Sequence, residues 1–516
     1  MIIYQVYPRS FYDSNSDGIG DLAGIERKLA YIKSLGVDAI WISPFFKSPM
    51  KDFGYDVADY RAVDPIFGTM EDFRSLMKAA KAQGLGILVD MVISHTSDEH
   101  EWFRQSRAKE NGRDDWYLWA DPKPDGSPPN NWVSVFGGPA WRWDAERRQY
   151  YFHSFLSSQP DLNMHHPDVQ KAVLAEMDFW LDMGVSGFRF DACNHLFQDT
   201  LLRNNPPRDN PVDALHPYGF QVHVYDQGRP EMLPFLEKVR KLLDAYGAFS
   251  LAEVGGTDPL KLMGEYTQPG RLHSAYSFAL MRGDSGAAYV RNVIATLEHH
   301  IHDESAACYA MSNHDKARVA TRWQNGRDRD ATARMHFALL LAMRGDICLY
   351  QGEELGLPQA EVPFERLQDP FGKSFWPKFK GRDGCRTPMP WADALHGGFS
   401  HAEPWLPVDP AHLGMNVALQ EAQPESMLQF ARTLIALRKA RPELHQGSIE
   451  LLDSPEGVLA FARRHGGSSI VCLFNLEGTA KKVQGIDFAE VVIGEHARVE
   501  ERAVTLDVSG YCLLQS

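Results

Sequence analysis

The sequence predicts a TIM-type (β/α)8 barrel, an α/β fold, with an inserted lid subdomain after the third strand and a C-terminal β-sandwich. Two observations predict the barrel. Strand-like and helix-like segments alternate through residues 2–350, and eight strand-like runs occur. Each of these runs is apolar almost throughout, which is typical of parallel strands that helices cover on both faces. Eight such strands favour a closed barrel, whose active site would lie at the C-terminal ends of the strands.

The expected elements follow one another along the chain as βα units. The strands are expected at 2–7, 37–43, 86–92, 187–192, 249–254, 274–278, 308–312 and 347–350. The helices are expected at 22–34, 70–83, 167–183, 232–246, 332–343 and 427–439.

Two irregular segments and a change of pattern divide the chain further. The stretch 95–162, rich in Trp, Asp, Pro and Asn, is too long for a simple βα loop, so we expect an inserted subdomain B there. A second lid is expected at 351–423. The tail, 446–516, has short alternating strands separated by Gly-containing turns, which predicts a β-sandwich. The barrel would then comprise 1–94 and 163–445.

Composition and charge exclude several classes of function. Hydrophobic residues make up 44% of the 516 positions, and no apolar run is long enough to span a bilayer. The 53 basic residues are outnumbered by 68 acidic ones, and no basic stripe could follow a phosphate backbone. We therefore expect no nucleic-acid and no membrane partner.

The cysteines and the N-terminus favour a cytoplasmic location. Residues 1–8 lack a basic region and a small-residue cleavage site, which argues against export. No cysteine spacing is typical of a zinc or redox site, so buried thiols in a reducing compartment are expected. The six cysteines are Cys193, Cys308, Cys348, Cys385, Cys472 and Cys512.

Ionisable residues gather at the C-terminal ends of the expected strands. These residues are Asp90, His95, Arg189, Asp191, Glu253, His314 and Asp315. A barrel brings its strand ends together, and a pair of carboxyl groups, one a nucleophile and one an acid, is what glycoside hydrolysis requires. Taken alone, Arg189 and Asp191 could equally form a structural ion pair within their strand.

Five segments resemble the α-amylase superfamily. Asp90-Met91-Val92-Ile93-Ser94-His95, Gly187-Phe188-Arg189-Phe190-Asp191, Leu251-Ala252-Glu253-Val254-Gly255 and Ser312-Asn313-His314-Asp315 resemble its four conserved regions, in order. Gln159-Pro160-Asp161-Leu162-Asn163 resembles a motif of the α-glucosidase and oligo-1,6-glucosidase branch. The resemblance extends over essentially the whole chain, including the lid motif at 381–391.

The resemblance implies a retaining glycosidase without a catalytic cofactor. Asp191 would be the nucleophile, Glu253 the general acid/base and Asp315 a stabiliser of the transition state. Arg189 should keep Asp191 ionised, whereas the apolar residues before Glu253 should favour its protonated form. Retention requires the two carboxyl groups to be about 5–5.5 Å apart.

The resemblance also implies how a sugar would be bound. His95 and His314 would hydrogen-bond to hydroxyl groups. Tyr55 would stack on the nonreducing glucose, and Asp56 with Arg382 would close the pocket behind it, which implies exo-action; without the other motifs, Asp56 would be interpreted as a solvated turn acid.

The residue after the nucleophile bears on linkage. Relatives that cleave α-1,6 bonds tend to carry valine at the position of Ala192, and those that cleave α-1,4 bonds or sucrose tend to carry alanine or threonine. We therefore expect short maltose-type α-glucosides and sucrose as substrates, with some transfer of glucose to sugar acceptors.

The loop 13–21 spaces oxygen-bearing side chains at alternate positions, as cation-binding loops do, although it lacks the glutamate of an EF-hand. In related glucosidases such a loop holds a structural Ca2+ or Mg2+. The ligands would be Asp13, Asn15, Asp17, the Ile19 carbonyl and Asp21. The alternative is a turn that satisfies its own hydrogen bonds.

Two rival functions remain at this stage. A sucrose isomerase or glucosyltransferase of the same fold would use the same covalent intermediate, and a non-catalytic, amylase-like binding subunit is a rival from another class. Binding subunits of that kind carry a membrane helix and lose catalytic acids, whereas this sequence keeps all three. The oligomeric state is expected to be monomer or homodimer.

Overall fold

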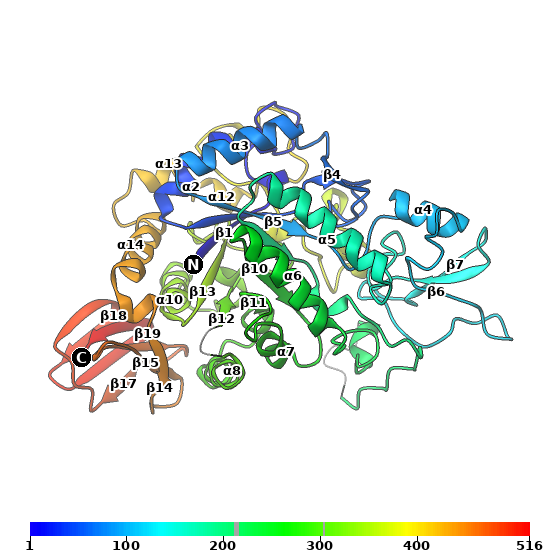
Figure 1. Ribbon diagram of the computed structural model, residues 1–516. Helices are drawn as coiled ribbons and strands as arrows, with labels where there is room; N and C mark the ends of the chain where they lie inside the picture. The colour runs from blue at the N-terminus through cyan, green and yellow to red at the C-terminus, as the bar shows by residue number, and fades with distance from the viewer. Residues whose placement is uncertain (211–215, 303–304) are drawn as a thin grey trace. The chain divides into compact units, whose positions relative to one another are not determined.

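The computed structural model describes residues 1–210, 216–302 and 305–516 (Figure 1). Eight strands form a closed barrel in the order β1-β13-β12-β11-β10-β9-β5-β2, which confirms the predicted barrel. The barrel strands are β1 (Ile2–Val6), β2 (Ala39–Ile42), β5 (Gly86–Met91), β9 (Gly187–Phe190), β10 (Phe249–Val254), β11 (Ser274–Ser277), β12 (Ala306–Tyr309) and β13 (Asp346–Tyr350). None of the eight extends more than two residues beyond the run expected from the sequence.

The longer predicted helices are also confirmed, with one correction. Among the described residues the principal helices are α3 (Met70–Ala82), α4 (Glu101–Ala108), α5 (Pro167–Asp182), α6 (Met232–Tyr246), α7 (Pro259–Tyr266), α8 (Ala287–His300), α10 (Arg329–Ala342) and α14 (Met427–Ala440). Shorter ones are α9 (Val319–Arg322), α11 (Pro370–Phe375), α12 (Pro410–Leu413), α13 (Val417–Glu421) and α15 (Pro442–His445).

The helix expected at 22–34 is instead two helices, α1 (Leu22–Arg27) and α2 (Leu29–Leu35). Lys28 separates them with φ −105° and ψ 6°, outside the helical range. Its ammonium lies 4.2 Å from the ring centroids of both Tyr12 and Trp391. Cation–π contacts with residues outside the helix accompany the break, and helical periodicity cannot predict such contacts.

The chain forms two compact units. One comprises 42–77 and 87–275 and contains β9, β10 and residues 87–91 of β5. In this unit the helices α5 and α6 lie side by side (Figure 1). Pro167 stands at the first position of α5, where its missing N–H costs nothing, and His166 caps that end by accepting from the Asp168 N–H.

The inserted segment of this unit has a small core of its own. Its sheet has the order β6-β8-β7, with β6 at Trp119–Ala120, β8 at Gln149–Phe152 and β7 at Trp141–Asp144. The rings of Trp132 and Trp141 stack 5.9 Å apart inside it. A second short ribbon pairs β3 (Phe46–Lys47) with β4 (Asp59–Val63).

The other unit comprises 1–41, 78–86 and 276–516 and includes the C-terminal domain. That domain is an antiparallel sheet with the order β14-β15-β16-β19-β17, and β18 pairs with the other side of β19. Its strands are β14 (Ser448–Leu451), β15 (Val458–His465), β16 (Ser468–Asn475), β17 (Lys481–Gln484), β18 (Glu490–Glu500) and β19 (Ala503–Gln515).

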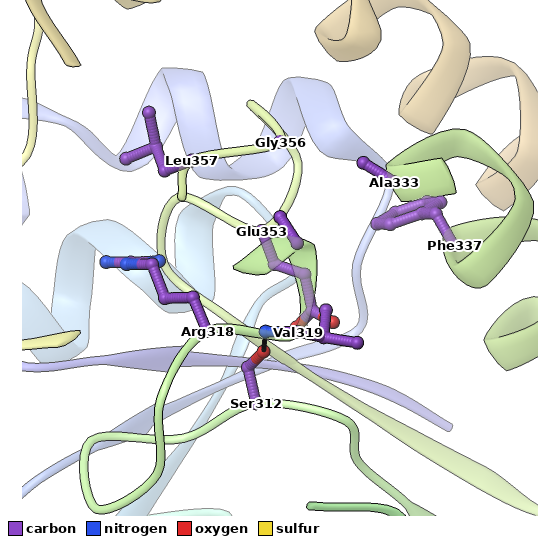
Figure 2. A pocket seen from close by; sticks show the side chains of 9 residues that line it. Ser312, Arg318, Val319, Ala333, Phe337, Glu353, Gly356 and Leu357 are labelled. Atoms are coloured by element: carbon purple, nitrogen blue, oxygen red, sulfur yellow. Dashed lines mark hydrogen bonds between the residues drawn. The ribbon is translucent and has the colours of Figure 1, made fainter. Parts of the chain in front are cut away.

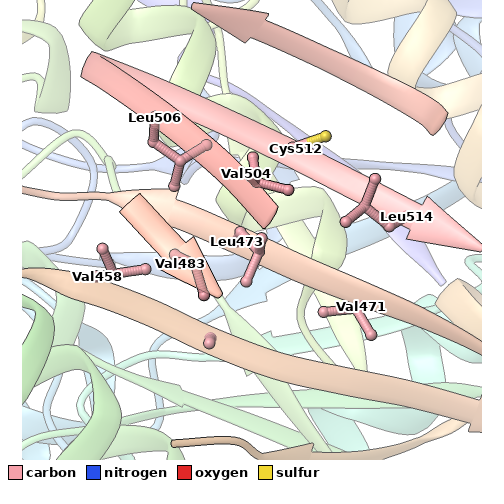
Figure 3. Packing of buried hydrophobic residues seen from close by; sticks show 9 residues of the cluster. Val458, Val471, Leu473, Val483, Val504, Leu506, Cys512 and Leu514 are labelled. Carbon is pink, nitrogen blue, oxygen red and sulfur yellow. The ribbon is translucent and has the colours of Figure 1, made fainter. Parts of the chain in front are cut away.

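The strands of this domain form one sheet whose two parts meet in β19. β19 pairs with β16 through 511–515 and with β17 through 503–506, and between these parts Ser509 has φ 57°. The hydrogen-bonded sheet is therefore continuous through β19. Val471, Val483 and Leu506 belong to one buried cluster that joins both parts (Figure 3).

All six cysteines are buried and none forms a disulfide, as expected. In the ranges that the structure describes, no helix is both long enough and apolar enough to cross a bilayer.

Candidate active site

Arg189 on β9 lies at the centre of a buried cluster of carboxyl groups. The barrel register places it beside Asp90 on β5 and Leu251 on β10. Its Nη1 donates to Asp90 Oδ1 at 2.8 Å and to Asp191 Oδ1 at 2.6 Å, and its Nη2 donates to Glu253 Oε2. One guanidinium thus holds three carboxyl groups from three neighbouring strand ends.

The excess of negative charge in this cluster favours a state in which one carboxyl group stays protonated. If all four side chains were ionised, negative charges would exceed positive ones by two, and Arg189 is fully buried. Burial raises the pKa of Asp90, although Arg189 and the Tyr55 hydroxyl, which donates to Asp90 at 3.0 Å, oppose the rise. Carboxyl groups that share such a site do not all ionise together, which is what a nucleophile and an acid side by side require.

The surroundings of Glu253 differ from the sequence expectation. We expected an apolar setting, because Phe249, Leu251 and Ala252 precede it. These residues do lie in β10, but the Glu253 side chain contacts Arg189, as Asp191 does. Its carboxyl therefore belongs to the same charged cluster as Asp191.

Asp56 is fully buried and is not a solvated turn acid. Its carboxylate accepts from the Ser48 hydroxyl at 2.9 Å and from the backbone N–H groups of Lys51 and Asp52 at 2.8 and 3.0 Å. Burial raises the pKa of Asp56 to about 6. The preceding turn uses Gly54 at φ 105°, where an added Cβ would lie 2.9 Å from the Pro44 carbonyl oxygen.

His95 is held by protein groups at both ring nitrogens. Nε2 lies 2.9 Å from the Tyr55 carbonyl oxygen and Nδ1 lies 2.9 Å from the Ser94 hydroxyl. Burial lowers the pKa of His95 to about 4, so the imidazole is neutral near pH 7. Gln159, from the branch motif, also donates to the Tyr55 carbonyl at 3.2 Å. These contacts fix the loop that carries Tyr55, while sugar binding by His95 stays a prediction.

Ala192 has a left-handed backbone, with φ 41° and ψ 45°, and is buried. The strand β9 therefore ends in a sharp turn directly after Asp191. A β-branched residue is strained in this conformation.

A second group of side chains surrounds Asp315 in the other unit. Its carboxylate lies 2.8 Å from Arg386 Nη2, 3.4 Å from Arg382 Nη1 and 3.4 Å from His314 Nε2. The His314 ring stacks on Tyr7, with centroids 5.7 Å apart. Asp315 thus lies within reach of two arginine side chains and one histidine.

Asp369 holds Arg382 in place, a role that sequence reasoning did not predict. Its carboxylate accepts from Arg382 Nη2 at 2.8 Å and from the Arg382 backbone N–H at 2.7 Å. Burial disfavours the charged form, but Arg382 and Arg386 outweigh it and lower the pKa of Asp369 to about 2. Asp369 caps the start of α11 and Pro370 is its first residue. This helix-start pattern was the one local sequence feature that could have drawn attention to Asp369.

Comparison with known proteins identifies the family. The catalytic-domain model of alpha amylase matches residues 5–447. The chain belongs to the alpha-amylase family. A probable alpha-glucosidase of Rhizobium meliloti (strain 1021) is 50% identical over 490 residues, which cover 93% of this chain and 89% of the relative.

Solved structures support this assignment. The alpha-glucosyl transfer enzyme XgtA is 50% identical, with a TM-score of 0.98 and coverage of 100% of this chain and 98% of that one. The trehalulose synthase MutB of Pseudomonas mesoacidophila MX-45 is 33% identical, with a TM-score of 0.91 and coverage of 100% and 98%.

In this alpha-amylase family member the loop 13–21 consists of turns closed by side chains. Asp13 Oδ1 accepts from the Asn15 and Ser16 N–H groups, and Asp21 Oδ2 accepts from the Ser14 N–H and hydroxyl. Within the described ranges, no group of three His, Cys, Asp or Glu side chains is arranged to hold an ion.

The loop nevertheless carries oxygen donors of the kind that hard cations prefer. Asp13 and Asp21 are buried, and the contacts shown for their carboxylates are with hydroxyl and backbone N–H groups. Burial, together with the nearby charge of Asp13, raises the pKa of Asp21 against its hydrogen bonds. Carboxylates in such surroundings would be stabilised by Ca2+ or Mg2+.

A small cavity is lined by residues other than the site residues named above (Figure 2). It has a volume of about 10 Å³, and its lining includes Ser312, Arg318, Glu353 and Leu357. Burial raises the pKa of Glu353 to about 7. The volume suits one water molecule and is far too small for a sugar ring, so we assign this cavity no role in substrate binding.

Proposed function

We propose that this chain is an exo-acting, retaining α-glucosidase that releases glucose from the nonreducing end of short α-glucosides. The observation that carries the proposal is the cluster in which Arg189 contacts both Asp191 and Glu253. Two carboxyl groups bound to neighbouring nitrogens of one guanidinium are compatible with the separation of about 5–5.5 Å that retention needs.

The proposed reaction has two steps. In the first, an Asp191 oxygen attacks the anomeric carbon while Glu253 gives its proton to the departing glycosidic oxygen, which leaves a glucosyl-aspartate ester. In the second, Glu253 takes a proton from water, whose oxygen displaces Asp191 and releases glucose. Arg189 stabilises the charge that remains on the cluster in each step.

The other side chains are proposed to bind the sugar. Tyr55 would stack on the nonreducing glucose, and Asp56 and Arg382 would bind its outer hydroxyl groups. Asp315 and His314, with His95, would bind ring hydroxyl groups nearer the broken bond. A pocket closed in this way admits chain ends only.

Transfer of glucose to a sugar is the second candidate. The intermediate is common to both reactions, and only the acceptor differs. The similarity to XgtA, described as an alpha-glucosyl transfer enzyme, favours transfer as a substantial activity. A non-catalytic binding role is not supported, since Asp191, Glu253 and Asp315 are all present.

A substrate panel tests the proposal. Maltose, isomaltose, sucrose, trehalose, maltotriose and soluble starch are supplied separately, and glucose and glucosylated products are quantified. We expect maltose to exceed starch in kcat/KM. Rapid loss of starch viscosity would show internal cleavage and contradict the closed pocket, and the ratio of product sugars to free glucose at high substrate separates transfer from hydrolysis.

Linkage preference should depend on residue 192. Ala192→Val should shift the maltose to isomaltose ratio of kcat/KM toward isomaltose, because a β-branched side chain beside Asp191 narrows the leaving-group subsite. The shift should correspond to about 1–3 kcal/mol. Valine is more strained than alanine in the left-handed backbone at 192, so Tm should fall as well.

Ala192→Gly is the matched control for linkage. Glycine accepts φ 41° and leaves the subsite open, so it should keep the maltose preference. A wild-type enzyme that prefers isomaltose would contradict the steric explanation.

The loop 13–21 is proposed to bind Ca2+ or Mg2+ for stability rather than for chemistry. Chelation should lower Tm more than the specific activity of the protein that stays folded, because bound metal stabilises only the native state. Asp21→Asn should lower the baseline Tm and make it insensitive to chelator.

Asp125→Asn is the control for this loop. Asp125 also closes a turn, by accepting from Ser127, but it is exposed. The Tm of the Asp125→Asn variant should respond to chelator as the Tm of the parent protein does. Active protein without a bound divalent ion, shown by elemental analysis, would contradict the metal proposal.

A further inference from the structure

We propose that Asn194 is a positioning residue that fixes the acid/base Glu253 relative to the nucleophile Asp191. The inference rests on the proposed function and adds to it a residue that does not itself touch the reacting atoms. It follows from the way in which the strands β9 and β10 end.

The backbone pairing of β9 with β10 stops just before the two carboxyl residues. The last pair in register is Phe190 with Ala252. Asp191 and Glu253 are the next residues on their strands, so the pairing of β9 with β10 does not reach them, although the Asp191 N–H donates to Met91 on β5 at 3.1 Å. Their separation therefore also depends on what restrains the chain beyond them.

Asn194 supplies that restraint. It lies in the short turn Cys193–His195 that follows Asp191 and is only 2% exposed. Its side-chain oxygen accepts from the Gly255 N–H at 2.8 Å, two residues after Glu253. The Asp191 and Glu253 segments are thus joined before the two residues by the ladder and after them by this hydrogen bond.

Val254, which directly follows Glu253, is fully buried at the end of β10, but the next two residues are glycines without side chains. Gly255 is followed by Gly256, whose φ of 99° is readily adopted only by glycine. An added Cβ at Gly255 would have Asn194 Oδ1 as its nearest neighbour, at 3.5 Å. Without the Asn194 acceptor, this glycine pair would lose its hydrogen bond to the Asp191 segment, and the position of Glu253 would be less restrained.

Asn194 is itself firmly placed. Its side-chain nitrogen donates to Gln227 Oε1, and its backbone carbonyl oxygen accepts from the Gly228 N–H at 2.7 Å. The first contact orients the side-chain amide so that its oxygen faces Gly255, and the second fixes the backbone from which that amide projects. A rigid amide is what a positioning role requires.

A displaced Glu253 would affect substrates unequally. A sugar leaving group needs a proton as its bond breaks, whereas an activated aryl leaving group departs as a stable anion and needs little help from an acid. Loss of positioning should therefore lower kcat/KM for maltose far more than for an activated aryl α-glucoside. General destabilisation of the fold would lower both alike.

The experiment compares Asn194→Ala with the parent enzyme on maltose and on 2,4-dinitrophenyl α-glucoside. We expect kcat/KM for maltose to fall by ~10-fold to 100-fold, a part of the ~10²-fold to 10⁴-fold that general acid catalysis contributes. For the aryl substrate, kcat/KM should fall by less than ~3-fold. Asn194→Asp keeps an acceptor for Gly255 but loses the donor to Gln227, so it should recover part of the maltose activity.

Asn205→Ala is the matched control. Asn205 is equally buried and accepts from the Val224 and Tyr225 N–H groups, but it does not contact Gly255. It should lower Tm without changing the ratio of the two substrates. An unchanged ratio in Asn194→Ala, or the same change in Asn205→Ala, would overturn the inference.

Glu253→Gln separates this inference from the proposed function. If Glu253→Gln itself shows no leaving-group dependence, the acid role of Glu253 is wrong. If it does and Asn194→Ala does not, only the positioning role is wrong.

Discussion

The Asp191→Asn variant should turn over maltose at least ~10³-fold more slowly than the parent enzyme, and Glu253→Gln should lose activity on the same scale. Asparagine cannot form the glucosyl ester, and glutamine can neither give nor take the proton. Both changes keep the size of the side chain and leave Arg189 a carbonyl oxygen to donate to. The variants should therefore fold, which circular dichroism and Tm would check.

The two variants should fail in different ways. With an activated aryl α-glucoside, Glu253→Gln should accumulate protein whose mass has increased by one glucosyl residue, because the ester forms without an acid but water is then not activated. Asp191→Asn should never acquire this mass. Such a difference would assign nucleophile and acid/base separately.

Asp199→Asn is the matched control for these losses. Asp199 is a buried aspartate of the same unit that pairs with Arg203 rather than with Arg189. Its activity should change by less than ~10-fold. Near-normal turnover of maltose by folded Asp191→Asn would contradict the assigned nucleophile.

The barrel could be predicted because its signal is local. Continuous apolar runs such as 86–92 and 249–254 reflect strands that are buried on both faces, and they recur eight times. The break at Lys28 could not be predicted, because the rings that contact Lys28 come from Tyr12 and from Trp391, far along the chain. Local propensity does not include such contacts.

For the candidate site, the sequence predicted the residues but not the contacts between them. Charged residues at the ends of apolar strands identified Arg189, Asp191 and Glu253, since such positions are costly without partners or a function. Which carboxyl groups Arg189 contacts depends on the register of β9 with β5 and β10, and no sequence pattern specifies that register. The contact with Glu253 was missed for this reason.

Supporting residues were harder to find than the groups they support. Asp369 and Asn194 act through hydrogen bonds to backbone and side chains that are distant in sequence or lie in turns. Aspartate and asparagine are common in turns for purely local reasons, so neither residue stands out. Only the folded structure shows what their oxygen atoms accept.

Arg189→Met should be the most destabilising single change in the site. Removing one partner of a buried ion pair costs about 3–5 kcal/mol, because the other charge is left buried and uncompensated, and here three carboxyl groups lose the same partner. Unfolding midpoints in urea or by heating would measure the loss. Arg61→Met, which breaks the exposed pair with Glu176, is the control and should cost at most ~1 kcal/mol.

The loss in Arg189→Met should depend on pH in a defined direction. Without the guanidinium, the folded-state pKa of Asp90 rises further above its unfolded value, because burial then acts with less opposition. A carboxyl group of this kind destabilises the folded state once the pH exceeds its unfolded pKa, and does so fully above its folded pKa. The Tm difference from the parent protein should therefore be smaller at pH 5 than at pH 8. A difference that is constant over this range, or larger at pH 5, would show that lost packing rather than uncompensated charge accounts for the effect.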